Sequence, residues 1–249
     1  ITGLVEYHRN FTYPGLQARD VLVWLPPGYE ENTANFYPVL YMHDGQNIVD
    51  PATSTLGVDW AVDESADSLI RNNSIEPFII VGINSTSDRT EEYSPGYFGS
   101  LYMDFLVNEL KPFIDENYRT KKDRENTAVA GSSMGGLISF MLLWEYDGIF
   151  SKGGCFSPAF KIGSFDYVFD VANYNDDKKD LLIYIDNGGV GLEAKLQPGI
   201  EEMVSLLKQK GFEEGNDLFV VFDKEAQHNE IAWAQRIPNF LKLMFGGNK

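Results

Sequence analysis

The feature that most constrains the fold is a serine set between closely spaced glycines near the middle of the chain. The segment Gly131-Ser132-Ser133-Met134-Gly135 has the pattern G-x-S-x-G. It follows a short apolar run at 127–130 and precedes an apolar-rich segment at 137–146, which predicts a buried strand followed by a helix. At such a turn larger flanking side chains would collide where the chain doubles back. The turn would raise the Ser133 hydroxyl above a sheet, in the arrangement called a nucleophile elbow.

The remaining pattern predicts alternating strands and helices. Two strand-like runs at 4–12 and 19–25 flank the turn residues Pro14-Gly15, so an antiparallel hairpin is expected at one sheet edge. After residue 37 strands and helices alternate, which favours a mostly parallel sheet covered on both faces. Further strands are expected at 37–42, 77–83, 153–156, 181–185 and 218–222, and helices at 60–71, 100–118, 200–210 and 230–245. The polar run 173–180 is expected to be a solvated loop, and no linker divides the chain, so residues 1–249 are expected to form a single domain.

Composition narrows the possible partners. The chain carries 20 basic and 37 acidic residues, a net charge of −17, which argues against binding to nucleic acid or anionic membranes. No apolar run approaches the ~18 residues of a membrane-spanning helix. The single cysteine, Cys155, excludes an intrachain disulfide and a cysteine metal cluster. The chain starts at Ile1 without a signal-like segment, so it is expected to be processed, trimmed or one domain of a longer protein. We expect a secreted or periplasmic location rather than a cytoplasmic one, and the sequence does not indicate an oligomeric state.

A nucleophilic serine needs a general base, and the chain offers three histidines. His8 lies in the first strand, and His43 ends the strand before the loop His43-Asp44-Gly45-Gln46. His228 follows the last predicted strand. In hydrolases built on this elbow the chain order is serine, acid, histidine, and only His228 fits that order. We therefore expect His228 to be the base and His43 to brace its loop.

Two carboxylates are candidates for the acid that orients the base. Asp186 directly follows the strand at 181–185, and Glu193 ends the glycine-rich loop that comes next. Either could hold the histidine in the right tautomer and stabilise its charged form. Asp186 could instead cap the glycine turn, and Glu193 could be an exposed residue at a helix start. The pattern alone leaves both open.

The oxyanion that forms during acyl transfer needs two N–H donors. The first is expected from Met134, which follows the nucleophile. The second is expected from Gln46, because the loop after the third strand supplies it in such hydrolases. Gly45 would let this backbone approach the substrate. This chemistry needs neither a metal nor an organic cofactor.

Several sequence blocks together resemble one family. They are Leu25-Pro-Pro-Gly-Tyr29, Val39-Leu-Tyr-Met-His-Asp-Gly-Gln-Asn47, Arg89 with Glu92-Tyr-Ser-Pro95, Glu109-Leu-Lys-Pro-Phe-Ile-Asp115, Tyr118-Arg-Thr120, Ala130-Gly-Ser-Ser-Met-Gly-Gly136, Phe156-Ser-Pro158 and His228-Asn-Glu-Ile-Ala-Trp233. The chain is identified as a member of the "putative esterase" branch of the α/β-hydrolases, with esterase D, the enterochelin esterases and the feruloyl and acetyl-xylan esterases of carbohydrate esterase family 1. The resemblance implies an α/β-hydrolase fold with about eight strands, an antiparallel N-terminal edge and helices on both faces.

The resemblance also implies roles and a reaction. Ser133 would be the nucleophile and His228 the base, with Met134 and Gln46 at the oxyanion. Counting back from Gly199 and Gly211 places Glu193 at the family's acid, although the longer glycine-rich loop here keeps Asp186 in play.

The implied activity is that of a serine carboxylesterase working through an acyl-enzyme. Its expected substrates are feruloyl or acetyl esters of plant polysaccharide, or small aryl and alkyl esters. The alternatives are a siderophore-lactone esterase, an acyltransferase to a sugar acceptor, and a binding module on a hydrolase scaffold. Tyr93 and Tyr97 follow a strand end, where substrates bind in such sheets, and are expected to contact the substrate.

Overall fold

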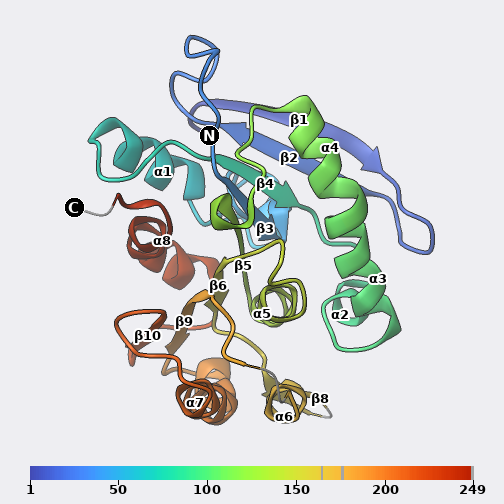
Figure 1. Ribbon diagram of the computed structural model, residues 1–249, viewed down its shortest axis with the longest axis vertical. Coiled ribbons are helices and arrows are strands. Elements are labelled where there is room, and N and C mark those ends of the chain that lie inside the picture. The colour runs from blue at the N-terminus through green and yellow to red at the C-terminus, as the bar shows by residue number, and fades with distance from the viewer. Residues whose placement is uncertain (164, 175–176, 248–249) are drawn as a thin grey trace.

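An eight-stranded sheet runs through the centre of the protein, in the order β1-β2-β4-β3-β5-β6-β9-β10 (Figure 1). The structure is a computed structural model that describes residues 1–163, 165–174 and 177–247. The strands are β1 (Leu4–Phe11), β2 (Arg19–Leu25), β3 (Val39–His43), β4 (Ile79–Ile83), β5 (Thr127–Ser132), β6 (Lys152–Phe156), β9 (Leu182–Gly188) and β10 (Leu218–Asp223).

Strand direction follows the prediction. β2 pairs antiparallel with β1 and with β4, whereas every pair from β4 to β10 is parallel. The carboxyl ends of the six parallel strands therefore share one edge of the sheet, where ligands bind in such folds. The predicted fold class, a mostly parallel sheet with an antiparallel N-terminal edge, is confirmed.

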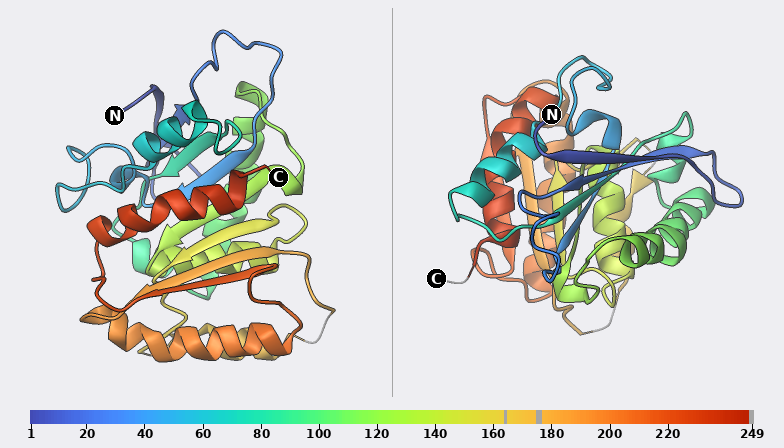
Figure 2. Two further views of the ribbon diagram at one scale, coloured as in Figure 1. Left: turned by 90° about the vertical axis from the view of Figure 1, so that its left-hand side faces the viewer. Right: turned by 90° about the horizontal axis from the view of Figure 1, so that it is seen from above.

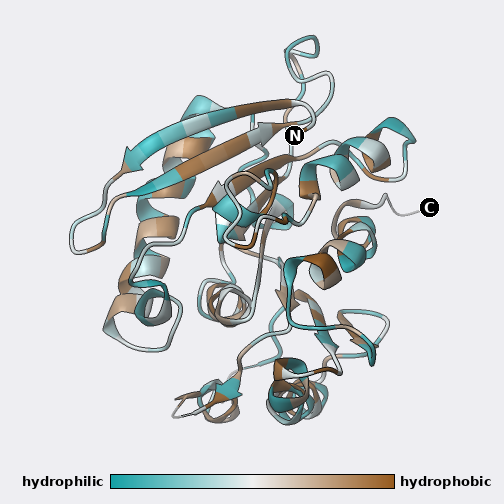
Figure 3. Cartoon of the chain, turned by 180° about the vertical axis from the view of Figure 1, so that it is seen from behind, coloured by the Kyte–Doolittle hydropathy of each residue, from teal (hydrophilic) through white to brown (hydrophobic). Residues whose placement is uncertain are grey.

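Helices cover both faces of the sheet (Figure 2). The longer ones are α1 (Val62–Arg71), α3 (Tyr97–Phe105), α4 (Lys111–Asn117), α5 (Met134–Glu145), α7 (Leu192–Gln209) and α8 (Glu230–Phe245). Successive strand residues point to opposite faces. Thus Val21 and Val23 join the core beneath α3, α4, α5 and α7, while Leu22 and Trp24 join the core beneath α1 and α8. Figure 3 shows hydrophobic residues concentrated along the central strands.

The helices differ from the sequence prediction in several places. The long helix predicted at 100–118 contains a π-helical turn at Leu106–Leu110 between α3 and α4. α7 begins at Leu192, not at 200, and continues through Pro198. The prediction was wrong there because Pro198-Gly199 looks like a break, whereas Leu196, Ile200 and Met203 are buried along one face and hold the helix together.

Short elements were not predicted. They are helix α2 (Arg89–Glu92), helix α6 (Tyr167–Ala172) and a small hairpin of β7 (Lys161–Ile162) with β8 (Phe165–Asp166). In the polar run 173–180, the described residues form no helix or strand, and residues 175–176 lie outside the described part. In the part of the chain that the structure describes, the helices are too short or too polar to cross a membrane.

Candidate active site

Ser133 lies at a sharp turn between the last residue of β5 and the first residue of α5. Its backbone has φ 59° and ψ −121°, a conformation that non-glycine residues rarely adopt. A Cβ atom at Gly131 would lie 2.6 Å from the Gly135 carbonyl oxygen, so the turn requires a glycine there. The Ser133 N–H donates to the Phe156 carbonyl at 2.9 Å, which ties the turn to β6. The chain therefore forms the strained elbow that its sequence predicts.

The elbow opens into a pocket of about 380 Å³. The pocket walls come from the loop after β3, the loop after β4 and the segment where α8 begins. Ser133 and His228 both line it. The structure records no hydrogen bond between these two side chains, and such bonds often tighten only in the substrate complex. The volume falls within the usual range for small-molecule sites.

His228 lies in the loop between β10 and α8 and contacts one of the two candidate acids. Its Nδ1 is 3.1 Å from Oε2 of Glu193, a fully buried carboxylate in the first turn of α7. The other oxygen, Oε1, accepts a hydrogen bond of 2.7 Å from the Ser157 hydroxyl. The His228 ring packs edge-on against Trp233 with 5.0 Å between ring centroids. The imidazole is thus held from two sides.

A glycine pair brings the Glu193 helix and the His228 loop together. The N–H groups of Gly189 and Val190 both donate to the Ala226 carbonyl, at 3.2 and 3.1 Å. A Cβ atom at Gly188 would collide with that same carbonyl. The glycine-rich loop therefore allows two backbones to pack directly against each other beside the His228 ring.

Asp186 forms a different set of contacts. Its Oδ2 pairs with Arg236 Nε at 2.7 Å and accepts a hydrogen bond of 2.9 Å from the Tyr184 hydroxyl. Its Oδ1 accepts the Ser157 N–H at 3.0 Å. Burial raises the pKa of Asp186 to about 6, while Arg236 acts to lower it. Both oxygens are engaged in this ion pair, so the alternative that placed Asp186 on the histidine does not match its contacts.

Comparison with known proteins identifies the family. The model of the family described as "Putative esterase" matches residues 17–244. The chain belongs to this family. The resemblance inferred from the sequence is confirmed, and the protein is a carboxylesterase.

Known proteins related to this esterase include enzymes of two kinds. It is 29% identical over 239 residues to an endo-1,4-beta-xylanase/feruloyl esterase of Xylanibacter ruminicola. The aligned region covers 90% of this chain and 29% of that protein. The chain thus spans less than a third of that relative. It has the fold of a ferulic acid esterase, with a TM-score of 0.79 and 23% identity over 97% of this chain and 98% of the other. The enterobactin esterase FES of Shigella flexneri shares the fold at a TM-score of 0.75 and 15% identity, over 98% and 59% of the two chains.

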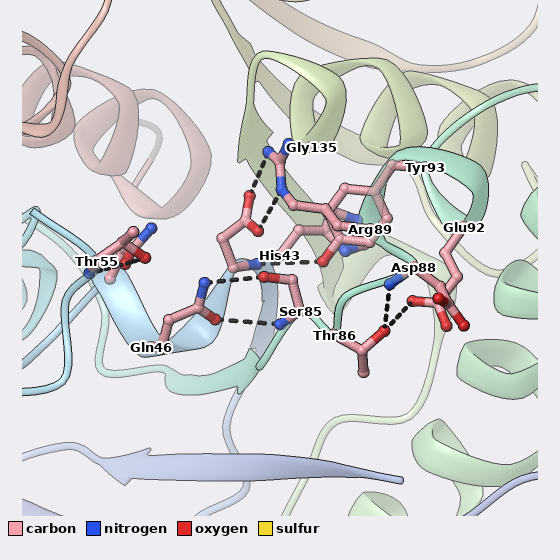
Figure 4. Close-up of polar contacts among 12 residues, drawn as sticks. His43, Gln46, Thr55, Ser85, Thr86, Asp88, Arg89, Glu92, Tyr93 and Gly135 are labelled. Atoms are coloured by element: carbon pink, nitrogen blue, oxygen red, sulfur yellow. Dashed lines mark hydrogen bonds and ion pairs between the residues drawn. The ribbon is translucent and has the colours of Figure 1, made fainter. Parts of the chain in front are cut away.

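The loop predicted to complete the oxyanion site forms a short 3-10 turn at Gly45–Asn47 in this esterase. Gln46 lines the pocket, and its side chain forms two hydrogen bonds with Ser85 (Figure 4). Gly45 packs on β4, where an added Cβ would lie 2.5 Å from the Gly82 carbonyl carbon. Gly45 is thus required for packing on the sheet rather than for approach to a substrate. Met134 begins α5, where first-turn N–H groups lack partners within the helix.

An ion pair that the sequence analysis missed holds the same loop. Arg89 of α2 binds Asp44 through two parallel hydrogen bonds of 2.7 Å each (Figure 4). Asp44 has a left-handed φ of 56°. Both residues line the pocket. The sequence did carry a signal for this ion pair. Asp44 follows β3 and Arg89 follows β4, and these neighbouring parallel strands end at the same edge of the sheet.

His43 lies beneath this loop, in the interior. Its Nδ1 is 2.8 Å from the Tyr102 hydroxyl, and burial lowers the pKa of His43 to about 3. The ring therefore stays neutral at ordinary pH and contributes to packing, as expected for a residue that braces the loop.

The two tyrosines predicted to contact substrate occupy different environments. Tyr93 is fully buried against His43 and Tyr102, so its predicted substrate contact is wrong. Its hydroxyl accepts a hydrogen bond from the Asp44 N–H. Tyr97 is 73% exposed at the start of α3 and does not line the pocket.

Among the described residues, one cluster of three acidic side chains has the spacing of metal ligands, and it lies outside the pocket. Ligand atoms of Asp59, Asp63 and Glu64 lie within 4.8 Å of one another at the start of α1. Burial raises the pKa of Asp63 to about 7, so this one carboxylate can carry a proton near neutral pH.

Proposed function

We propose that this esterase is a serine hydrolase with Ser133 as nucleophile, His228 as base and Glu193 as the acid that orients it. The observation that carries this proposal is the pairing of His228 with a buried carboxylate on the pocket that holds the strained Ser133 elbow. The N–H groups of Met134 and Gln46 are proposed as the oxyanion donors. Asp186 is assigned a structural role through its pairing with Arg236.

The reaction follows from these positions. His228 removes the Ser133 proton as the oxygen attacks the ester carbonyl carbon, and the carbonyl oxygen becomes an oxyanion held by the two N–H groups. Collapse of this intermediate breaks the ester bond, and His228 gives its proton to the leaving alcohol. Water then repeats both steps on the acyl-enzyme and releases the acid. Glu193 stabilises the imidazolium each time it forms.

For the substrate we propose feruloyl or acetyl esters of plant polysaccharide. Support comes from the 29% identical relative, whose name includes feruloyl esterase, and from a pocket lined by both apolar and polar groups such as Leu56, Trp233 and Ser85. A siderophore lactone is the second candidate, supported by the fold shared with an enterobactin esterase. The net charge of −17 is a poor match for an anionic ferric complex.

The nucleophile is tested with Ser133→Ala. We expect hydrolysis of p-nitrophenyl acetate, p-nitrophenyl butyrate and methyl ferulate to fall by about 10³-fold or more, with an unchanged circular dichroism spectrum. Ser132→Ala removes the adjacent hydroxyl and is the matched control, expected to retain turnover. Undiminished hydrolysis by the Ser133 variant would refute the assignment.

The same assay ranks the substrates. Faster cleavage of methyl ferulate than of the acetyl ester would favour an aromatic acyl pocket. Enterobactin cleavage in place of ferulate cleavage would favour the siderophore reading. Ester formation with an added sugar acceptor would indicate acyl transfer.

A further inference from the structure

The pocket contains one carboxylate that has no role in the proposed mechanism and no partner in the described part of the chain. Glu230 is the first residue of α8, it lines the pocket, and it is 7% exposed. The other acidic residue that lines the pocket, Asp44, is paired with Arg89. Among the described residues, no hydrogen bond or ion pair engages the Glu230 carboxylate.

Helix capping does not fully explain why an acidic residue is buried at position 230. An acidic residue in the first turn interacts favourably with the helix dipole. However, the N-cap of α8 is already provided by Asn229, whose side chain accepts the Ala232 N–H at 3.0 Å. The Glu230 oxygens are not sealed off from solvent, and because the residue lines the pocket, a molecule bound there can reach them. Burial leaves this carboxylate little room for hydrating water, and a hydroxyl group of a bound molecule can supply a donor in place of that water.

The mechanism indicates which part of the substrate lies beside Glu230. His228 must pass its proton to the oxygen of the leaving alcohol, so that alcohol lies at the His228 end of the pocket. Glu230 is two residues beyond His228, where the loop enters α8. Arg89 and Asp44 line the pocket from the loops after β4 and β3. Because Glu230 comes from the same segment as His228, and Asp44 and Arg89 come from other loops, we assign its carboxylate to the alcohol side of the ester.

We propose that Glu230 is a specificity-determining residue that accepts a hydrogen bond from a hydroxyl group of the leaving alcohol. This inference rests on the proposed serine-esterase function. It assigns the pocket to esters of polyhydroxylated alcohols, such as a sugar residue, over esters of simple alkanols. The same negative charge disfavours leaving groups that carry carboxylates or ionised catechols.

The test uses two esters with the same acyl group. Feruloyl arabinose and methyl ferulate differ only in the alcohol, so the ratio of their kcat/KM values isolates recognition of the leaving group. We expect Glu230→Ala to lower this ratio by about tenfold or more, the usual effect of losing a hydrogen bond to a charged group. Glu230→Gln keeps a carbonyl acceptor without the charge and should retain part of the preference.

Glu225→Gln is the matched control, since Glu225 is an exposed carboxylate of the same loop that does not line the pocket. It is expected to keep the wild-type ratio. Equal losses on both esters in both Glu230 variants, with melting temperatures intact, would overturn the inference while leaving the esterase mechanism standing. Absence of Ser133-dependent hydrolysis of either ester by the wild type would instead overturn the proposed function. If the wild type prefers acetyl groups, the pair becomes acetylated xylose and methyl acetate.

Discussion

Two buried carboxylates near the end of β9 show how neighbours decide a role. Glu193 shares its oxygens between His228 and Ser157, whereas Asp186 shares its oxygens among Arg236, Tyr184 and Ser157. Ser157 touches both and also accepts a hydrogen bond from Trp233 at 2.9 Å. The Asp186–Arg236 ion pair thus supports Glu193 through Ser157, and neither member of the ion pair lines the pocket.

These two sets of contacts predict that conservative substitutions of the two carboxylates affect different properties, catalysis at Glu193 and stability at Asp186. Glu193→Gln should lower kcat by about 10² to 10⁴-fold at an unchanged melting temperature, because an amide cannot stabilise the imidazolium. Asp186→Asn should instead lower stability by about 3 kcal/mol, since it leaves the buried Arg236 without its counter-charge. Steady-state kinetics and urea unfolding of the two variants measure these effects. A large kcat loss confined to Asp186→Asn would reverse the assignment of the acid.

At the scale of elements, the loop after β3 is held by α2. The two parallel bonds between Arg89 and Asp44 fix a left-handed residue two positions before the proposed oxyanion donor Gln46. Lysine keeps the charge of arginine but cannot form this paired contact. We expect Arg89→Lys to lower kcat about tenfold with little change in KM, because the loop matters most when the oxyanion forms. An unchanged kcat in a stopped-flow or steady-state assay would contradict this role.

The sequence predicted elements well where the signal was local. The elbow, its flanking strand and helix, and α8 at Glu230–Phe245 follow from short patterns. The start of α7 was missed because Pro198-Gly199 locally resembles a break, while packing against the sheet continues the helix. The choice between Glu193 and Asp186 was open because it depends on Arg236, which is distant in sequence, and the burial of Tyr93 depends on contacts with two other elements.

At the scale of the whole molecule, His43 links stability to pH. Its folded pKa of about 3 lies below the ordinary value of about 6.5, so between these values the unfolded chain binds a proton that the folded chain excludes. The contribution of His43 to stability is therefore full above pH 6.5 and falls as the pH drops toward 3, by up to about 1.4 kcal/mol per pH unit.

Urea unfolding at pH 7 and pH 5 measures this effect. His43→Gln should show a smaller loss of unfolding free energy between the two pH values than the wild type. Equal slopes in the wild type and in His43→Gln would remove His43 as the cause.

The order of the site residues along the chain has a consequence for biosynthesis. Ser133 follows a central strand, while Glu193 and His228 follow β9 and β10, the last two strands to be made and the outermost two on their side of the sheet. Chains grow from the N-terminus at about 5–20 residues per second, so a nascent chain contains its serine several seconds before it contains the histidine. With the proposed roles, the growing polypeptide cannot acylate Ser133 on an ester before His228 has been made, and turnover begins only after β10 has joined the sheet.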